Sequence, residues 1–124
     1  MLRLVLKAYL KLIQFEFHLT RRNFAALHTE VQRYPVAVSN GSNHSIENIC
    51  AAVDMACIWY WKPVLCLQRS AATVCLLRRA GVSAELVIGA QQMPFRAHAW
   101  VEVQGRVVND KPYTREMYAV LDKC

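Results

Sequence analysis

The sequence predicts an α+β protein, with helices in the first two thirds of the chain and an antiparallel sheet in the last third. Two observations favour this class. Apolar residues recur every three or four positions as far as Ala80, which is the period of amphipathic helices. Beyond Gly81 the period changes to two, as in strands that bury one face. We expect residues 1–124 to form a single domain, because this length suits one hydrophobic core and 55% of the residues are hydrophobic.

Residues 1–17 are predicted to form an amphipathic helix with an unusually wide apolar side. Its polar residues share one narrow face: Arg3, Lys7, Lys11, Gln14 and, just beyond, His18. Charges interrupt the apolar run, which argues against a signal peptide, and no run approaches the ~18 residues of a membrane span. We expect the apolar side to pack on the protein's own core. Docking on a partner protein or on a membrane surface is the alternative.

Two further helices are expected in the helical part of the chain. Thr20 is a candidate cap for a second helix, which Pro35 would end. Residues 36–45, rich in Ser, Asn and Gly, are expected to form a flexible loop. A third helix is predicted from about Ile46 to Trp61, and Ser45 is one of two candidates for its cap.

The fourth helix, about residues 64–80, carries the cysteine at the centre of the predicted site. A proline before it and a glycine after it mark its limits. At about 100° per residue, Cys66 falls on the core-facing side, whereas Cys75 and Gln68 fall opposite. Cys66 also lies near the amino-terminal end, where free backbone N–H groups and the helix dipole favour a thiolate. The sequence therefore indicates Cys66, and not Cys75, as a nucleophile.

The remaining third of the chain has the alternation of strands. We expect strands at residues 84–90, 97–103 and 106–109. The tail after Pro112 is expected to form a short helix.

The turn between the last two strands decides whether His98 and Asp110 meet. A two-residue turn, 104–105, would place Asp110 opposite Ala99, on the wrong face of the strand. A three-residue loop, 103–105, shifts the register by one and gives better side-chain pairs, so we expect this loop. Its pairs are Glu102–Arg106, Trp100–Val108 and His98–Asp110.

A cysteine at a helix start, a histidine in a strand and an aspartate after the next strand suit nucleophilic catalysis. Cys66 would attack a carbonyl, His98 would accept and return the proton, and Asp110 would orient the imidazole. Each also has an ordinary structural alternative: a core cysteine, a hydrogen-bonded histidine and a turn aspartate. Candidates for lining the substrate cleft are Trp61, Phe95 and Trp100.

Composition narrows the possible partners and cofactors. The net charge of +6 suits an acidic protein or peptide, an anionic membrane surface or nucleic acid. The basic residues are dispersed without the aromatic–basic motif of a nucleic-acid module, which argues against nucleic acid. The five cysteines lack the close pairs of a structural zinc site, so we expect neither a metal nor another cofactor. Because the sequence shows no convincing signal peptide, we expect a reducing cytoplasm in which the cysteines are free thiols.

Two blocks, CLQRSAATVCLLRRAGVSAELVIGA and FRAHAWVEVQGRVVND, resemble the catalytic segment of the lasso-peptide leader peptidases. These belong to the transglutaminase-like, papain-related cysteine hydrolases, and the resemblance covers about residues 60–112. It places the family's nucleophile, base and acid on Cys66, His98 and Asp110. It implies a transglutaminase-like, papain-like catalytic core over residues 62–124. The helical patterns described above make residues 1–61 the helical part of the same domain.

The resemblance implies a bacterial cysteine protease that removes the leader peptide from a ribosomally made precursor. The implied partners are the precursor's leader, a leader-binding protein and the ATP-dependent cyclase that closes the macrolactam ring. Only helical patterns precede Cys66, so the leader-binding domain is expected on a separate protein. Two alternatives use the same fold: a non-catalytic carrier of the precursor, and a transglutaminase-type acyl transferase with the same triad.

Overall fold

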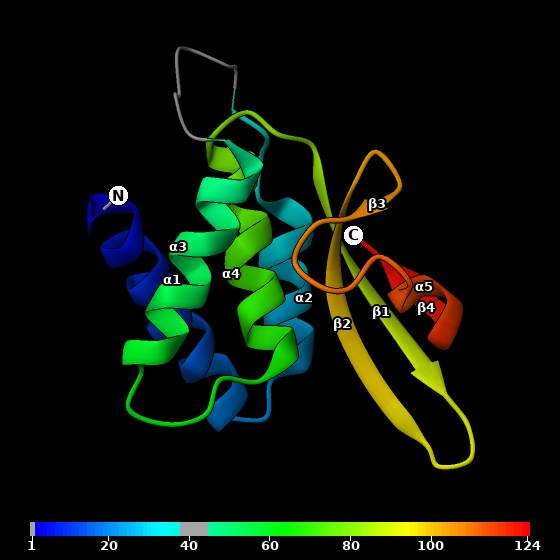
Figure 1. The fold of residues 1–124 in the computed structure, drawn as a ribbon. Coiled ribbons are helices and arrows are strands. Elements are labelled where there is room, and N and C mark those ends of the chain that lie inside the picture. The colour runs from blue at the N-terminus through cyan, green and yellow to red at the C-terminus, as the bar shows by residue number, and fades with distance from the viewer. Residues whose placement is uncertain (1, 38–44) are drawn as a thin grey trace.

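The computed structural model describes residues 2–37 and 45–124. Within these residues four long helices precede a four-stranded antiparallel sheet, which confirms the predicted α+β class. The helices are α1 (Leu2–Thr20), α2 (Phe24–Arg33), α3 (Ile46–Trp59) and α4 (Cys66–Arg79). They gather on one side of the sheet, and α4 lies between the other helices and the strands (Figure 1).

The sheet has the strand order β3-β2-β1-β4. Its strands are β1 (Ala84–Gln91), β2 (Arg96–Val103), β3 (Arg106–Val107) and β4 (Ala119–Lys123), with the short helix α5 (Thr114–Met117) before β4. The predicted helix in the tail is thus confirmed, but the sequence did not reveal β4. All five β4 residues are exposed, so this edge strand has no alternation of apolar and polar side chains to detect.

The helix caps confirm one prediction and correct another. Ser45 caps α3, since its hydroxyl accepts a hydrogen bond from the N–H of Asn48 at 3.1 Å. The predicted cap Thr20 is wrong, because α1 continues to that residue, and Asn23 caps α2 through the N–H of Ala26 at 3.1 Å. Of the predicted flexible loop, residues 38–44 lie outside the described part of the chain.

Helix α4 is buried on nearly every side. The helices cover one of its sides and strands β1 and β2 cover the other, so both Ser70 and Cys75 lie in the core. The expectation that Gln68 points away from the core is wrong: its amide donates to the carbonyl of Leu12 in α1 at 2.7 Å and is 1% exposed. A helix between two layers has no solvent face, so a helical wheel cannot assign one.

The turn between β2 and β3 is the two-residue turn, and the predicted three-residue loop is wrong. Val103 pairs with Arg106 and Glu102 with Val107. Gln104 and Gly105 have φ angles of 53° and 77°, as a type I′ turn requires. This turn matches the right-handed twist of the strands, and that match outweighed the side-chain pairs on which the prediction rested.

Candidate active site

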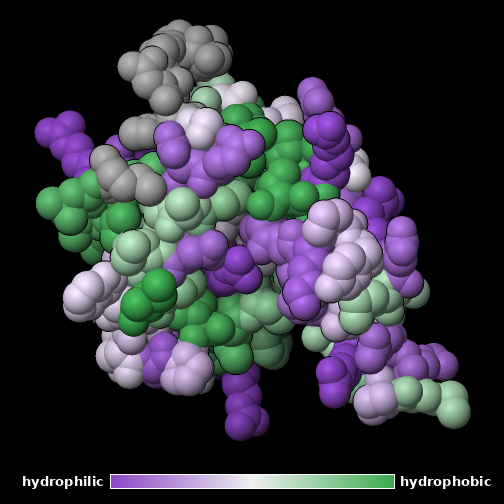
Figure 2. Space-filling view, viewed as in Figure 1, coloured by the Kyte–Doolittle hydropathy of each residue, from purple (hydrophilic) through white to green (hydrophobic). Residues whose placement is uncertain are grey.

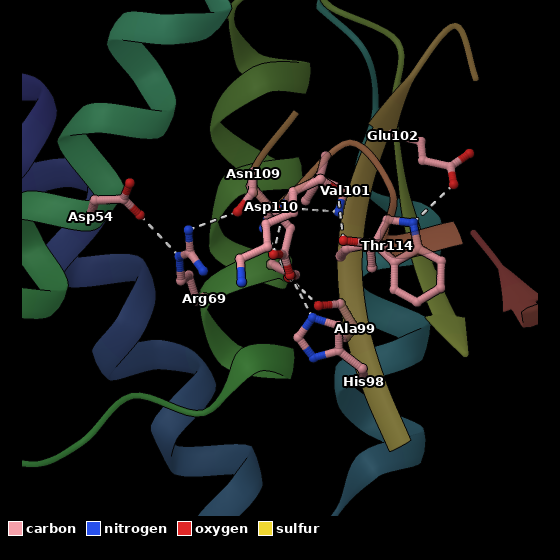
Figure 3. Close-up of polar contacts among 12 residues, drawn as sticks. Asp54, Arg69, His98, Ala99, Val101, Glu102, Asn109, Asp110 and Thr114 are labelled. Carbon is pink, nitrogen blue, oxygen red and sulfur yellow. Dashed lines mark hydrogen bonds and ion pairs between the residues drawn. The ribbon is translucent and has the colours of Figure 1, made fainter. Parts of the chain in front are cut away.

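His98 and Asp110 form a close pair near the start of β2. This part of the strand does not pair with β3. His98 Nε2 lies 2.5 Å from Asp110 Oδ2, and the two side chains are 24% and 23% exposed (Figure 3). Because Nε2 is bound to the carboxylate, the imidazole tautomer with hydrogen on Nε2 leaves Nδ1 free to accept a proton. The pair has the arrangement of a base and the acid that orients it.

Asp110 reaches His98 because the chain leaves the β-ladder soon after the turn. Val108 still donates its N–H to the carbonyl of Val101, at 3.0 Å. The next bond to β2 comes from a side chain: Asn109 Oδ1 accepts the N–H of Val101 at 2.8 Å. The backbone therefore bends at Asn109, and strand alternation no longer decides where Asp110 points. This bend is why the two-residue turn does not separate His98 from Asp110.

Helix α4 holds this bend in place through two neighbouring side chains. Ser70 donates to the carbonyl of Ala99 at 3.1 Å and accepts from Asn109 Nδ2 at 3.0 Å. Arg69 donates to the carbonyl of Asn109 at 2.7 Å and pairs with Asp54 of α3 at 2.9 Å. Ser70, Asn109 and Arg69 are positioning residues that the sequence argument did not single out. The helical wheel did place Ser70 beside Cys66, which was the available signal.

Cys66 is the first residue of α4 and is half-buried. It lies one helical turn, about 6 Å along the axis, before Ser70. Since Ser70 donates to the backbone carbonyl of Ala99, the residue after His98, α4 packs against β2 close to the position of His98 in the chain. Figure 3 shows the His98 ring beside β2, with its Nε2 directed at the carboxylate of Asp110. Within the described residues the Cys66 thiol makes no hydrogen bond, so the structure records the pair His98–Asp110 and not a contact of the thiol with it.

Two aromatic rings pack beside the imidazole, Trp100 stacked on it and Tyr118 tilted. The ring centres of Trp100 and Tyr118 lie 6.0 and 5.2 Å from that of His98. Position 89, opposite His98 in β1, is a glycine because a Cβ there would come within 2.6 Å of the Trp100 ring. A small cavity of about 170 Å³ opens beside the pair and is lined by His98, Asp110, Lys111, Thr114, Met117 and Tyr118.

The predicted cleft residues do not gather at this cavity. Trp100 is fully buried, and its indole N–H donates to Glu102 at 2.9 Å, so it supports His98 from the inside and presents no surface to a substrate. Trp61 is exposed and stacks on Tyr60 at 4.2 Å between ring centres. Phe95 is exposed just before β2.

The ionisable groups differ in their surroundings. Partial burial alone would raise the pKa of Asp110, but the hydrogen bonds from His98 and from the N–H of Lys111 and the charge of Arg69 together lower it. Burial raises the pKa of Cys75 to about 12 and that of Cys50 to about 11. At neutral pH Asp110 is thus a carboxylate, while Cys75 and Cys50 remain protonated thiols.

The backbone at the start of α4 suits the chemistry of acyl transfer. The first backbone N–H groups of α4 have no partner within the helix and can stabilise an oxyanion. Gln68 cannot be the second oxyanion donor in this arrangement, since it bonds to α1. Among residues 2–37 and 45–124 no three His, Cys, Asp or Glu side chains are grouped to hold a metal ion.

The chain thus combines a helix that begins with Cys66, an antiparallel sheet and a His–Asp pair at the edge of that sheet. The family model of the transglutaminase-like superfamily matches residues 9–123, and the chain belongs to this superfamily. The chain is also similar to the microcin J25-processing protein McjB of Escherichia coli, with 43% identity over 56 residues. That alignment covers 45% of this chain and 27% of McjB. No solved structure matches.

The family match confirms the resemblance seen in the two sequence blocks at the level of the superfamily. No helix in the described part of the chain is both long and apolar enough to cross a membrane.

Proposed function

We propose that this protein is a cysteine endopeptidase that removes the leader peptide from a ribosomally made lasso-peptide precursor. The observation that supports this most directly is the His98–Asp110 pair, whose neighbouring backbone is held by Ser70 and Asn109. Ser70 lies one turn after Cys66 on the same helix. The similarity to McjB, whose name states that it processes microcin J25, supports a peptide substrate.

In the proposed reaction Cys66 Sγ attacks the carbonyl carbon of the scissile peptide bond. His98 Nδ1 accepts the thiol proton, and Asp110 stabilises the resulting imidazolium. The tetrahedral intermediate collapses to a thioester, and His98 returns the proton to the departing amine. A water molecule, deprotonated by His98, then hydrolyses the thioester and restores the free thiol.

The first residues of β2 support an extended peptide as substrate, because this part of the strand edge is only partly occupied: Ser70 bonds the carbonyl of Ala99, and no strand pairs there within the described residues. Both backbone groups of Val101 face the β3 side, and so by alternation do those of Ala99 and Ala97. Within the described residues no strand pairs with β2 on this side before Val101, and Ala97 is exposed. A peptide added along this edge would bring its backbone carbonyls beside His98.

The proposal includes partners and a location. We infer that a separate leader-binding protein presents the precursor, that the ATP-dependent cyclase acts on the product, and that the reaction takes place in the bacterial cytoplasm. The family match and the similarity to McjB support such a processing system.

Mass spectrometry of a lasso precursor incubated with this chain, with and without the leader-binding protein, tests the proposal. We expect a leader fragment and a core peptide from the parent chain and from Cys75→Ala, and intact precursor with Cys66→Ala. Cys75 is a matched control because it lies on the same helix but in the core. Cleavage by folded Cys66→Ala, or equal loss in both variants, would contradict the assignment.

The superfamily match also supports a second reaction, in which an amine replaces water as the acceptor of the same thioester. Adding a primary amine to the incubation separates the two: a transferase gives an amine-linked product, and a peptidase gives a free carboxylate. A non-catalytic carrier gives neither product, and its Cys66→Ala variant behaves like the parent.

A further inference from the structure

Helix α1 has two apolar faces, of which only one is used by the core. The inner face is buried and consists of Leu4, Ala8, Leu12 and Phe15. The outer face is 40–76% exposed and consists of Leu2, Leu6, Leu10, Ile13 and Phe17. Packing on the core, as expected from the sequence, therefore does not account for the five exposed apolar residues of this helix.

The outer residues form a straight stripe. They follow one another at intervals of four, four, three and four residues, so they share one side of the helix along about 22 Å of its axis. Single exposed apolar residues are ordinary on a protein surface, but five in line on one helix mark an interaction surface. Figure 2 shows hydrophobic atoms at the surface over the first turns of α1, with hydrophilic atoms beside them.

The charges beside this stripe are positive. Arg3 and Lys7 are exposed on α1, and the guanidinium of Arg21 lies 4.1 Å above the ring of Phe17. The acidic residue of this helix, Glu16, is turned inward: its side chain is 14% exposed and bonds to Tyr60 and Lys62, both at 3.1 Å. The stripe thus has cationic neighbours on its own helix and no free carboxylate there.

We propose that the outer face of α1 docks this protein on an anionic membrane surface. An exposed helix with Leu and Phe on one side and Lys and Arg beside them has the pattern of a helix that lies in the lipid headgroup layer. Negative headgroups complement Arg3, Lys7 and Arg21, and each such residue strengthens binding by roughly fivefold. Docking through α1 leaves the site open, because α1 lies on the far side of α4 from the sheet (Figure 1).

Sedimentation with phosphatidylcholine vesicles, with and without phosphatidylglycerol, tests the proposal. We expect the full chain to bind only the vesicles with phosphatidylglycerol, and to be released by high salt. The double change Leu6→Glu with Leu10→Glu should abolish this binding. The double change Arg3→Gln with Lys7→Gln should weaken it roughly 25-fold, from about fivefold per charge.

The matched control is Val120→Glu with Leu121→Glu, which adds the same charge to exposed apolar residues of β4 and should leave vesicle binding unchanged. Circular dichroism checks that each variant folds. No binding by the parent, or binding that survives in folded Leu6→Glu with Leu10→Glu, would overturn the proposal. So would a parent dimer that this variant converts to a monomer without any vesicle binding, since the face would then belong to a second copy of the chain.

Discussion

Asp110 shows what a single residue contributes at this site. It was predicted from its place after a strand, and the structure places its carboxylate against His98 Nε2. The residues that hold it there, Ser70 and Asn109, were not predicted as part of the site. The side chain of Asn109 bonds the N–H of Val101, where a neighbouring strand would normally do so. Such a bond leaves no periodic signal in the sequence, so only the structure reveals it.

The lowered pKa of Asp110 predicts how Asp110→Asn changes stability with pH. A carboxyl group whose pKa is lower in the folded state stabilises the fold above its unfolded pKa, about 4, and loses this contribution as the pH falls through the folded value. We therefore expect Asp110→Asn to lower the melting temperature at pH 6, and the difference from the parent to shrink below pH 4.

Asp122 offers a control for this prediction, because it bonds to His28 at 2.5 Å in a more exposed pair. We expect Asp122→Asn to change the melting temperature less at every pH, since exposed pairs contribute little. A constant difference between Asp110→Asn and the parent down to pH 2 would show that the carboxylate does not act as described.

At the scale of secondary structure, prediction worked where local rules apply. The limits of α3 and α4 were predicted to within about two residues, because Ser45, Pro63 and Gly81 act locally on the backbone. The hairpin was wrong because its register depends on a balance between turn geometry and side-chain pairs. Glu102 also has stronger partners than Arg106, which removes the main argument for the predicted loop.

The observed turn predicts the effect of Gln104→Asn. Gln104 has a φ of 53°, a left-handed conformation that asparagine tolerates better, and Asn-Gly is the preferred pair for a type I′ turn. We expect the free energy of unfolding to rise by about 0.5–1 kcal/mol in urea denaturation. The same change in a helix, Gln32→Asn in α2, should lower it, since asparagine is a poorer helix former. A loss of stability in Gln104→Asn would argue against the two-residue turn.

At the scale of the whole molecule, the class of fold was predictable, but the pairing of the C-terminal strand β4 with β1 was not. The change of period near Gly81 was enough to indicate α+β. The return of the C-terminal segment to β1 was hidden, because it depends on Glu102, a fully buried carboxylate. Arg115 of α5 and Lys123 of β4 reach it at 3.1 and 3.2 Å, and thereby hold this segment over β2.

The change Glu102→Gln tests whether this carboxylate holds the C-terminal segment in place, and the neighbouring carboxylate Glu85 provides the control. Glu102→Gln removes the negative charge that faces Arg115 and Lys123, so we expect the free energy of unfolding to fall by about 1–3 kcal/mol. Glu85 lies directly opposite Glu102 in β1, and like charges in that position repel. Glu85→Gln should therefore leave stability unchanged or raise it by up to about 1 kcal/mol. Equal losses in both variants would contradict the role of Glu102.

The activation of Cys66 by the His98–Asp110 pair is tested most directly by the rate at which iodoacetamide alkylates this thiol, followed by mass spectrometry at neutral pH. We predict that Cys66 reacts in the parent on the order of tenfold faster or more than in His98→Ala, because the imidazole no longer accepts the thiol proton. His28→Ala, which breaks the second His–Asp pair, should react like the parent. Equal rates in the parent and in folded His98→Ala would contradict the proposed triad.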